Sequence, residues 1–165
     1  MTDERLGDHL WQALERLPAG AGGVVFRQAE LDPADRLAIG RKVAAVASAR
    51  GLTLAVARSQ ILAEELGAQL VHNPDLAGKL PFSRSVHDER EAIAAKDAGA
   101  SLIFVSPVFP TRSHPDRPAL GVNRSLTLAE LAGVPAIALG GMNAERFKSL
   151  SGQFHGYAGI DCWLG

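Results

Sequence analysis

The chain has 165 residues, of which 47% are hydrophobic and 21% charged, and its formal net charge is −1. This length predicts a single domain over residues 1–165, and the charge excludes a broad electrostatic attraction to nucleic acid or to an anionic membrane. No apolar run approaches the roughly 18 residues of a membrane span, and the first ten residues are charged where a signal peptide would be apolar. The single cysteine, Cys162, forms no internal disulfide, which fits a cytoplasmic location.

Short apolar runs alternate with helical patterns along the chain. We expect strands near residues 24, 54, 70, 83, 104, 137 and 158, the last at 156–161 with Cys162 assigned to it, and helices at 9–17, 32–50, 59–66, 88–98, 126–132 and 143–150. Asp32-Pro33 and Asn143 are typical helix starts, and Gly51 and Gly99 are typical stops. Apolar strands that alternate with helices indicate a parallel sheet, either doubly wound or closed into a (β/α) barrel.

The most informative segment is the loop Val105–Gly121, which contains four prolines and follows an apolar run. Each proline fixes φ near −65° and removes a backbone donor, so the loop can neither form a helix nor join the centre of a sheet. About fifteen stiffened residues exceed the usual connection of roughly 2–6 residues. We therefore interpret this segment as a binding loop, with a proline-rich surface excursion as the alternative.

In either architecture the catalytic and ligand-binding residues lie at the C-terminal ends of the strands. Arg27 stands at such an end, and alternation along a strand would place Val25, Arg27 and Ala29 on one side. The arginine fork suits phosphate oxygens, and an ion pair is the alternative. Gly140-Gly141 lies between a strand and a capped helix, where glycines let backbone amides approach an anion, and a simple tight turn is the alternative.

Three histidines and an aspartate complete the candidates. His87 and His114 occupy strand-end or loop positions where an imidazole acts as an acid or a base, and an exposed histidine without a role is the alternative for each. His72 follows an apolar strand and is expected to be structural. Asp75 is one of few strand-end carboxylates, which is too sparse a pattern to define a metal site by itself.

Taken together, these residues resemble the thiamine phosphate synthase/TenI family. The resemblance is strongest over Gly99–Thr111, continuing through Pro115-Asp116, Pro118 and Leu120-Gly121, and weaker matches are Ser85-Val-His87, Ile137–Met142 and Gly67–His72. Pro107-Val-Phe109 is closer to the synthase branch than to the TenI branch. The resemblance implies a (β/α)8 TIM-barrel-like fold, in which Met1–Arg5 is similar to the tail of the first strand.

The same resemblance implies that the barrel is incomplete at both ends of the chain. The first strand would be truncated or missing, and no full closing helix would follow Trp163. Such a barrel leaves unpaired backbone beside the strand at residues 23–28 and beside the last strand. A second copy of the chain or a partner chain could cover this edge.

Synthases of this family join hydroxymethylpyrimidine diphosphate to thiazole phosphate in thiamine biosynthesis and release pyrophosphate with Mg²⁺. The resemblance therefore implies phosphorylated pyrimidine and thiazole substrates, and no nucleic-acid or membrane partner. The catalytic candidates are Arg27, Ser85 and His114. The candidates for substrate and phosphate binding are Arg27, Arg58, Ser106, Thr111, Ser113, Gly140 and Gly141, and the candidate metal ligand is Asp75.

Several positions depart from the family pattern. Ala57-Arg58 stands where the family has Asn-Asp, whose aspartate is a Mg²⁺ ligand, so Arg58 puts a fixed positive charge at that place. His114 replaces a lysine, and Asp161 replaces a serine near the thiazole phosphate. Three hypotheses remain open: a synthase that retains activity, in full or impaired, a protein of TenI type or one that binds another phosphorylated ligand, and an inactive homologue that acts with a partner chain.

Overall fold

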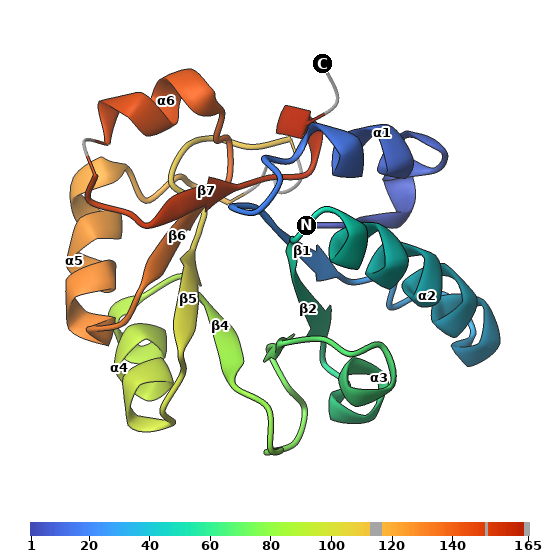
Figure 1. The fold of residues 1–165 in the computed structure, drawn as a ribbon. Helices are drawn as coiled ribbons and strands as arrows, with labels where there is room; N and C mark the ends of the chain where they lie inside the picture. The colour runs from blue at the N-terminus through green and yellow to red at the C-terminus, as the bar shows by residue number, and fades with distance from the viewer. Residues whose placement is uncertain (113–116, 151, 164–165) are drawn as a thin grey trace. The chain divides into compact units, whose positions relative to one another are not determined.

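A computed structural model of the protein describes residues 1–112, 117–150 and 152–163. The chain forms two compact units, one made of residues 1–81 with Trp163 and the other of residues 82–162. Figure 1 shows strands and helices alternating along the chain in both units. Of the candidate residues, Ser113 and His114 lie outside the described residues.

The first unit holds three parallel strands in chain order. Its elements are η1 (Glu4–Leu6), α1 (His9–Arg16), β1 (Gly23–Phe26), α2 (Pro33–Ala49), β2 (Thr53–Ala57), α3 (Gln60–Glu65) and β3 (Leu70–His72). Phe26 lies opposite Val56 between β1 and β2, and Ala57 lies opposite His72 between β2 and β3. The three strands therefore end at the same edge of the sheet.

The helices of this unit begin where the sequence predicts them. The Asp32 carboxylate accepts hydrogen bonds from the backbone amides of residues 34 and 35, and the Ser59 hydroxyl accepts one from Leu62. Such caps satisfy amides that have no partner within the helix. Val43 of α2 and Phe26 of β1 are fully buried, so α2 covers one face of the strands.

The second unit holds four parallel strands, again in chain order. Its elements are β4 (Phe82–Val86), α4 (Glu89–Asp97), β5 (Leu102–Val105), α5 (Val122–Ala132), β6 (Ala136–Leu139), α6 (Ala144–Ser149), β7 (Gly156–Ala158) and η2 (Asp161–Trp163). Helices α4 and α5 pack against each other and against β4 and β5 (Figure 1). The core between them contains Val86, Ile103, Val105, Leu128 and Leu150.

Alternation along β4 and β5 separates this core from a second face. Ile103 and Val105 point into the core under the helices, so Phe104 points to the opposite side. Ser85 lies opposite Phe104 in the parallel register and therefore shares its side. This second face is where a candidate site residue of β4 is presented.

Two elements differ from the sequence prediction. Helix α5 begins at Val122 rather than near Leu126, because the buried hydroxyl of Ser125 donates to the carbonyl of Gly121 at 2.7 Å and allows a polar first turn. The last strand ends at Ala158, so Cys162 lies in the 3-10 helix η2 and is only partly buried. The expectation that Cys162 belongs to the final strand is therefore wrong.

The N-terminal residues lie beside β1. The amide of Thr2 donates to the carbonyl of Val25 at 2.9 Å, and Asp3 has an extended backbone. This agrees with the expected similarity between Met1–Arg5 and the tail of a strand. Part of the β1 edge is consequently paired within the chain.

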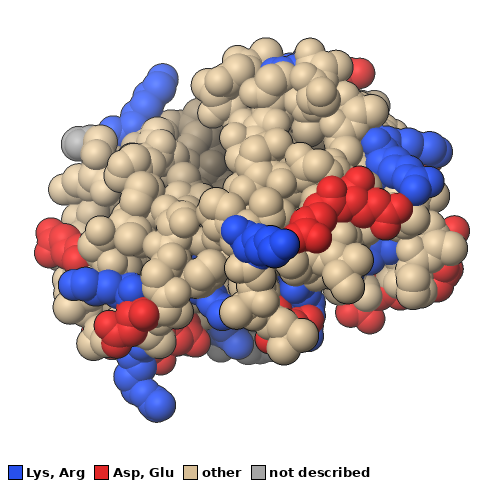
Figure 2. Space-filling view, turned by 60° about the horizontal axis from the view of Figure 1, so that its bottom comes forward, with Lys and Arg blue, Asp and Glu red and all other residues tan. Residues whose placement is uncertain are grey.

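The surface charges are mixed in sign. Figure 2 shows Lys and Arg side chains next to Asp and Glu side chains on the face it presents, in agreement with the net charge of −1. Among the described helices, none combines the length and the apolar character that crossing a membrane requires.

Candidate active site

Three consecutive strands of the first unit end in an uncommon backbone conformation. Gln28 after β1, Arg58 after β2 and Asn73 after β3 have φ angles of 32°, 71° and 46°. They are the residues other than glycine with positive φ in the described part of the chain. A side chain in this region costs free energy, and such residues gather at functional sites. The strand ends of the first unit are therefore a candidate functional site.

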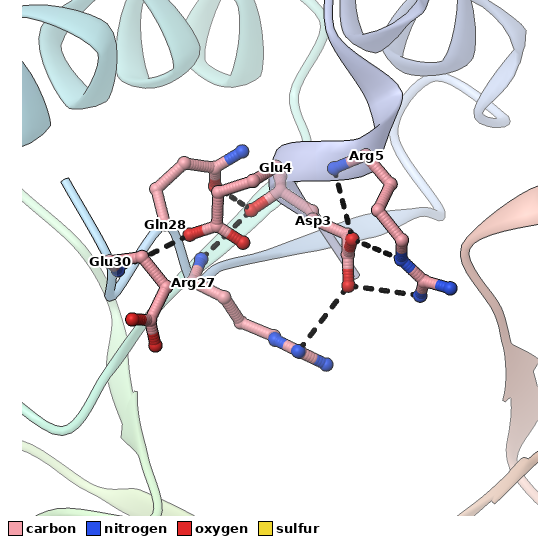
Figure 3. Close-up of polar contacts among 7 residues, drawn as sticks. Asp3, Glu4, Arg5, Arg27, Gln28 and Glu30 are labelled. Carbon is pink, nitrogen blue, oxygen red and sulfur yellow. Dashed lines mark hydrogen bonds and ion pairs between the residues drawn. The ribbon is translucent and has the colours of Figure 1, made fainter. Parts of the chain in front are cut away.

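Arg27 is held by an ion pair at the end of β1. Its Nη2 lies 3.5 Å from Oδ2 of Asp3, and its amide donates to the Thr2 hydroxyl at 2.8 Å. Asp3 is itself held by Arg5, whose Nε lies 2.6 Å from Oδ1 (Figure 3). The ion-pair alternative for Arg27 thus describes the structure, although 40% of the Arg27 side chain is exposed. The strand ends at Phe26 and Gln28 is left-handed, so the expected alternation does not extend to Ala29.

Asp3 is a buried carboxylate that the sequence reasoning passed over as a strand tail. Only 8% of its side chain is exposed. The hydrogen bonds from Arg5, together with the charges of Arg5 and Arg27, lower the pKa of Asp3 against the opposing effect of burial. Asp3 is therefore a fixed negative charge that orients two arginines.

Arg36 is a second residue that the sequence reasoning missed. Its Nη2 donates to the carbonyl of Ala57 at 2.8 Å and its Nε to the carbonyl of Arg27 at 3.2 Å, so it ties the ends of β1 and β2 together. Burial, and then the charge of Arg58, lower the pKa of Arg36. A sequence signal existed, because a cation at the end of the first turn opposes the usual helix-dipole preference.

Arg58 and Asp75 form a two-pronged ion pair. Nη2 of Arg58 lies 2.9 Å from Oδ1 of Asp75, and Nε lies 3.1 Å from Oδ2. Both side chains are more than half exposed, at 62% and 55%. The amide of Asp75 also donates to the carbonyl of Arg58 at 3.2 Å, which joins the two loops by backbone. The candidate metal ligand is therefore engaged by the candidate phosphate ligand.

The donor set in the described residues does not fit Mg²⁺. This ion takes oxygen ligands in octahedral geometry, usually from one or more carboxylates. No group of three His, Cys, Asp or Glu side chains that could hold a metal ion occurs among the described residues. The carboxylate of Asp75 already lies on the guanidinium of Arg58. Metal binding by Asp75 therefore stays a prediction without support from this geometry.

Histidines at two strand ends have partners. His87 follows β4, and both its amide and its Nδ1 lie 2.7 Å from Oε2 of Glu91. His72 is buried at the end of β3, with its Nε2 3.3 Å from the side-chain Nδ2 of Asn73, as expected for a structural residue. His87 is therefore paired with a carboxylate one helical turn away, and His72 is part of the buried interior.

In the second unit, Ser85 and Ser106 lie at the ends of neighbouring strands. The amide of Ser106 donates to the carbonyl of Val86 at 3.0 Å, so the two candidates come from adjacent parallel strands β4 and β5. Both side chains are partly buried. By alternation from Phe104, the two serines share the face opposite the helix-covered core.

The loop after β5 is fastened to the turn after β6. The amides of Val108 and Phe109 donate to the carbonyls of Leu139 and Gly140 at 2.9 and 3.1 Å, and the Leu120 amide donates to the Pro107 carbonyl at 2.8 Å. The Ser106–Pro107 peptide is cis. These bonds fix the loop on both sides of the segment containing Thr111, which is partly buried.

Gly140 and Gly141 allow this loop to approach. A Cβ on Gly140 would lie 2.7 Å from Cα of Pro107, and one on Gly141 would lie 2.4 Å from the carbonyl oxygen of Pro110. Both residues also have positive φ, 90° and 61°. The guanidinium of Arg146 stacks on Phe109 at 4.9 Å and donates to the Gly141 carbonyl. The close approach that these glycines permit is to the chain itself, and their binding of phosphate stays a prediction.

Comparison with known proteins agrees with the resemblance. The model of the family described as thiamine monophosphate synthase matches residues 1–161. The thiamine-phosphate synthase of Pyrococcus abyssi is 23% identical over 182 residues, covering 100% of this chain and 85% of that protein. The thiamine-phosphate synthase of Mycobacterium leprae is 44% identical over 71 residues, covering 40% and 30%.

A solved structure shows the fold. The thiamine phosphate pyrophosphorylase from Pyrococcus furiosus superposes with a TM-score of 0.84 at 22% identity, covering 99% of this chain and 85% of the other. The expected TIM-barrel-like class is therefore confirmed, with seven parallel strands in the described residues. Since the family model spans nearly the whole sequence, the chain belongs to the thiamine monophosphate synthase family.

Proposed function

We propose that the protein is a thiamine phosphate synthase, which joins hydroxymethylpyrimidine diphosphate to thiazole phosphate and releases pyrophosphate in thiamine biosynthesis. The observation that carries this proposal is the match of the family model to residues 1–161, together with a loop fastened at the end of β5. The named relatives of this chain are synthases as well. Both substrates are phosphorylated, so the site must supply positive charge and hydrogen-bond donors.

The leaving diphosphate determines what the first unit has to provide. As the bond to diphosphate breaks, negative charge accumulates on the leaving group, and fixed donors aimed at that charge lower the barrier. Arg27 and Arg58 stand at the ends of β1 and β2, and their side chains are 40% and 62% exposed. Arg36 holds the two strand ends and acts as a positioning residue. We assign diphosphate binding to Arg27 and Arg58.

The second unit supplies the remaining candidates. Ser85, Ser106 and Thr111 offer hydroxyl donors at or after the ends of β4 and β5, and Gly140-Gly141 offers backbone amides after β6. Hydroxyls and amides of this kind suit a phosphate monoester. We assign thiazole phosphate to this group, and His114 to acid–base work in the same loop.

An activity assay tests the proposal. Purified protein is mixed with both precursors, and pyrophosphate release and thiamine phosphate formation are followed. We expect product with the wild-type chain and a loss of about a hundredfold with Arg27→Ala, since one charged donor to the leaving group is removed. Arg41→Ala is the matched control, because Arg41 pairs with Glu65 at 2.9 Å on the helices α2 and α3. Absence of thiamine phosphate at high protein concentration, with and without Mg²⁺, would refute the proposal.

A second function is favoured by one observation. Arg58 occupies a position where the family pattern has a Mg²⁺ ligand, and it pairs with Asp75. Such a site would bind an anion, and it lacks the metal ligand with which the family pattern supports catalysis. A phosphate-binding protein of this family, alone or with a partner chain, would bind thiazole phosphate or thiamine phosphate saturably and yield no product. Calorimetric titration of both ligands, beside the activity assay, separates the two functions.

Assembly and location belong to the same proposal. A second copy or a partner chain would cover the part of the barrel edge that Thr2 does not pair, and light scattering of the purified protein measures whether copies associate. A cytoplasmic location rests on the single cysteine, which suits a reducing compartment.

A further inference from the structure

The ion pair at the end of β2 has the geometry of an anion site that is already filled. Arg58 presents Nε and Nη2 to the two carboxylate oxygens of Asp75, at 3.1 and 2.9 Å. Two phosphate oxygens match the same fork. Because both side chains are more than half exposed, an anion from solution has access to this pair.

The backbone holds Arg58 in place independently of Asp75. Arg58 is left-handed, with φ of 71°, and its amide donates to the carbonyl of His72 at 2.8 Å. For an arginine this conformation is uncommon and is maintained by surrounding contacts. The backbone of Arg58 is therefore fixed at the strand end, and the exposed side chain extends from that point to whichever anion it contacts.

Further guanidinium groups lie near Arg58, and the carboxylates of Glu4 and Asp75 lie near one of them, Arg36. Arg36 is close enough for the charge of Arg58 to depress its pKa, after the larger effect of burial. Arg27 stands at the end of the neighbouring strand β1 and meets Asp3 only through a long 3.5 Å contact. An incoming polyanion would thus meet Arg58 after β2, with Arg27 after the neighbouring strand β1 and Arg36 on helix α2.

We propose that these arginines hold a diphosphate group without a divalent metal ion, and that Asp75 is an internal counter-ion which the diphosphate displaces from Arg58. The choice of ligand rests on the proposed function, in which pyrophosphate is a product. Arg58 acts here as the counter-charge, in the place where the family pattern has a carboxylate that binds Mg²⁺.

The two kinds of site predict opposite effects for Asp75. In a metal site the carboxylate attracts the cation that binds the diphosphate, so removing its charge weakens diphosphate binding. In an arginine site the carboxylate competes with the diphosphate, so removing its charge strengthens binding. An exposed ion pair contributes modestly, and we therefore expect Asp75→Asn to bind about two- to fivefold tighter.

Titration calorimetry of the full chain with inorganic pyrophosphate tests this proposal. Titrations are run in EDTA and in MgCl₂ at equal ionic strength, for the wild type, Asp75→Asn, Arg58→Gln and the control Arg41→Gln. We expect binding in EDTA, tighter binding by Asp75→Asn, and a loss of at least about tenfold in Arg58→Gln. Arg41→Gln should bind like the wild type, since its exposed pair with Glu65 lies on α2 and α3. Circular dichroism confirms that each variant is folded.

Other outcomes overturn the proposal. Binding that appears only with Mg²⁺, weaker binding by Asp75→Asn, or no binding under either condition would each do so. These titrations contain neither organic precursor, so their failure is distinct from a failure of the synthase assay. If the chain binds pyrophosphate in EDTA but forms no thiamine phosphate, the diphosphate site is supported and the proposed synthase function is refuted.

Discussion

The fit between Gly140 and the loop after β5 can be tested with one added methyl group. In Gly140→Ala the new Cβ would lie 2.7 Å from both Cα and Cβ of Pro107, a separation that real Cβ atoms do not show. Residue 140 also has a φ of 90°, which an L side chain rarely adopts. The substitution therefore combines backbone strain with a steric clash against Pro107, whose backbone and ring cannot move away as a flexible side chain could.

The magnitude follows from these two effects. A left-handed residue with a Cβ costs roughly 1–2 kcal/mol, and overpacking by a methyl group costs about 1–3 kcal/mol. The free energy of unfolding should fall by about 2–5 kcal/mol. In a chain of this size each kcal/mol corresponds to roughly 2–4 °C, so the midpoint of thermal unfolding should fall by about 4–20 °C.

Gly99→Ala separates the two effects. Gly99 has a similar φ of 76°, and a Cβ built on it meets nothing within 4 Å. It should therefore lose only the strain, about 1–2 kcal/mol. Urea and thermal unfolding measure both variants, and hydrogen exchange follows the amides of Val108 and Phe109, which should lose protection in Gly140→Ala alone. Equal destabilisation of the two variants with unchanged exchange would refute the described contact between loop and turn.

Three further predictions concern single polar groups. Arg36→Met keeps an unbranched stem but removes the guanidinium and its two donors to strand-end carbonyls, so urea unfolding should show a loss of about 1–3 kcal/mol, and an unchanged midpoint would contradict the role of this residue. Asp3→Asn removes a carboxylate whose folded-state pKa is lowered, so its contribution to stability is complete above about pH 4 and is lost as the pH falls through the folded-state pKa. The difference in unfolding free energy between wild type and Asp3→Asn should therefore shrink at acidic pH. A difference that grows at acidic pH would contradict a lowered pKa for Asp3 in the folded state. Ser125→Ala removes a buried hydroxyl that donates to the Gly121 carbonyl, and we expect a cost of about 1 kcal/mol together with fraying of the first turn of α5, measured by hydrogen exchange.

Secondary structure was predictable from the sequence because its signals are local. Ser59 and Asp88 cap the helices that follow them, and Gly51 and Gly99 take the positive φ that ends the preceding helix. Each of these effects depends on a few neighbouring residues. The start of α5 escaped prediction because its first turn is polar and gains its stability from Ser125, a residue that ordinarily favours a cap or a turn.

The partners of the site residues were not predictable in the same way. Arg27 meets Asp3 across 24 positions and Arg58 meets Asp75 across 17, and the chain holds 17 basic and 18 acidic residues from which such pairs could be drawn. Only the fold decides which charges approach. For the same reason Arg36 gave only a weak signal, since its role is defined by two carbonyls on different strands.

The two groups of candidate residues are held by different kinds of contact, and this decides what a substitution in each reports. Backbone hydrogen bonds and the lack of a Cβ on Gly140 fasten the loop after β5, so a change there alters folding before it alters binding. The residues of that loop that resemble the family motif accordingly have a packing role in this structure. Arg58 and Asp75 are exposed and pair through side chains, so changes there should alter anion binding while the free energy of unfolding stays nearly constant. Measuring both quantities for each variant separates residues that build the fold from residues that determine which anion the chain binds.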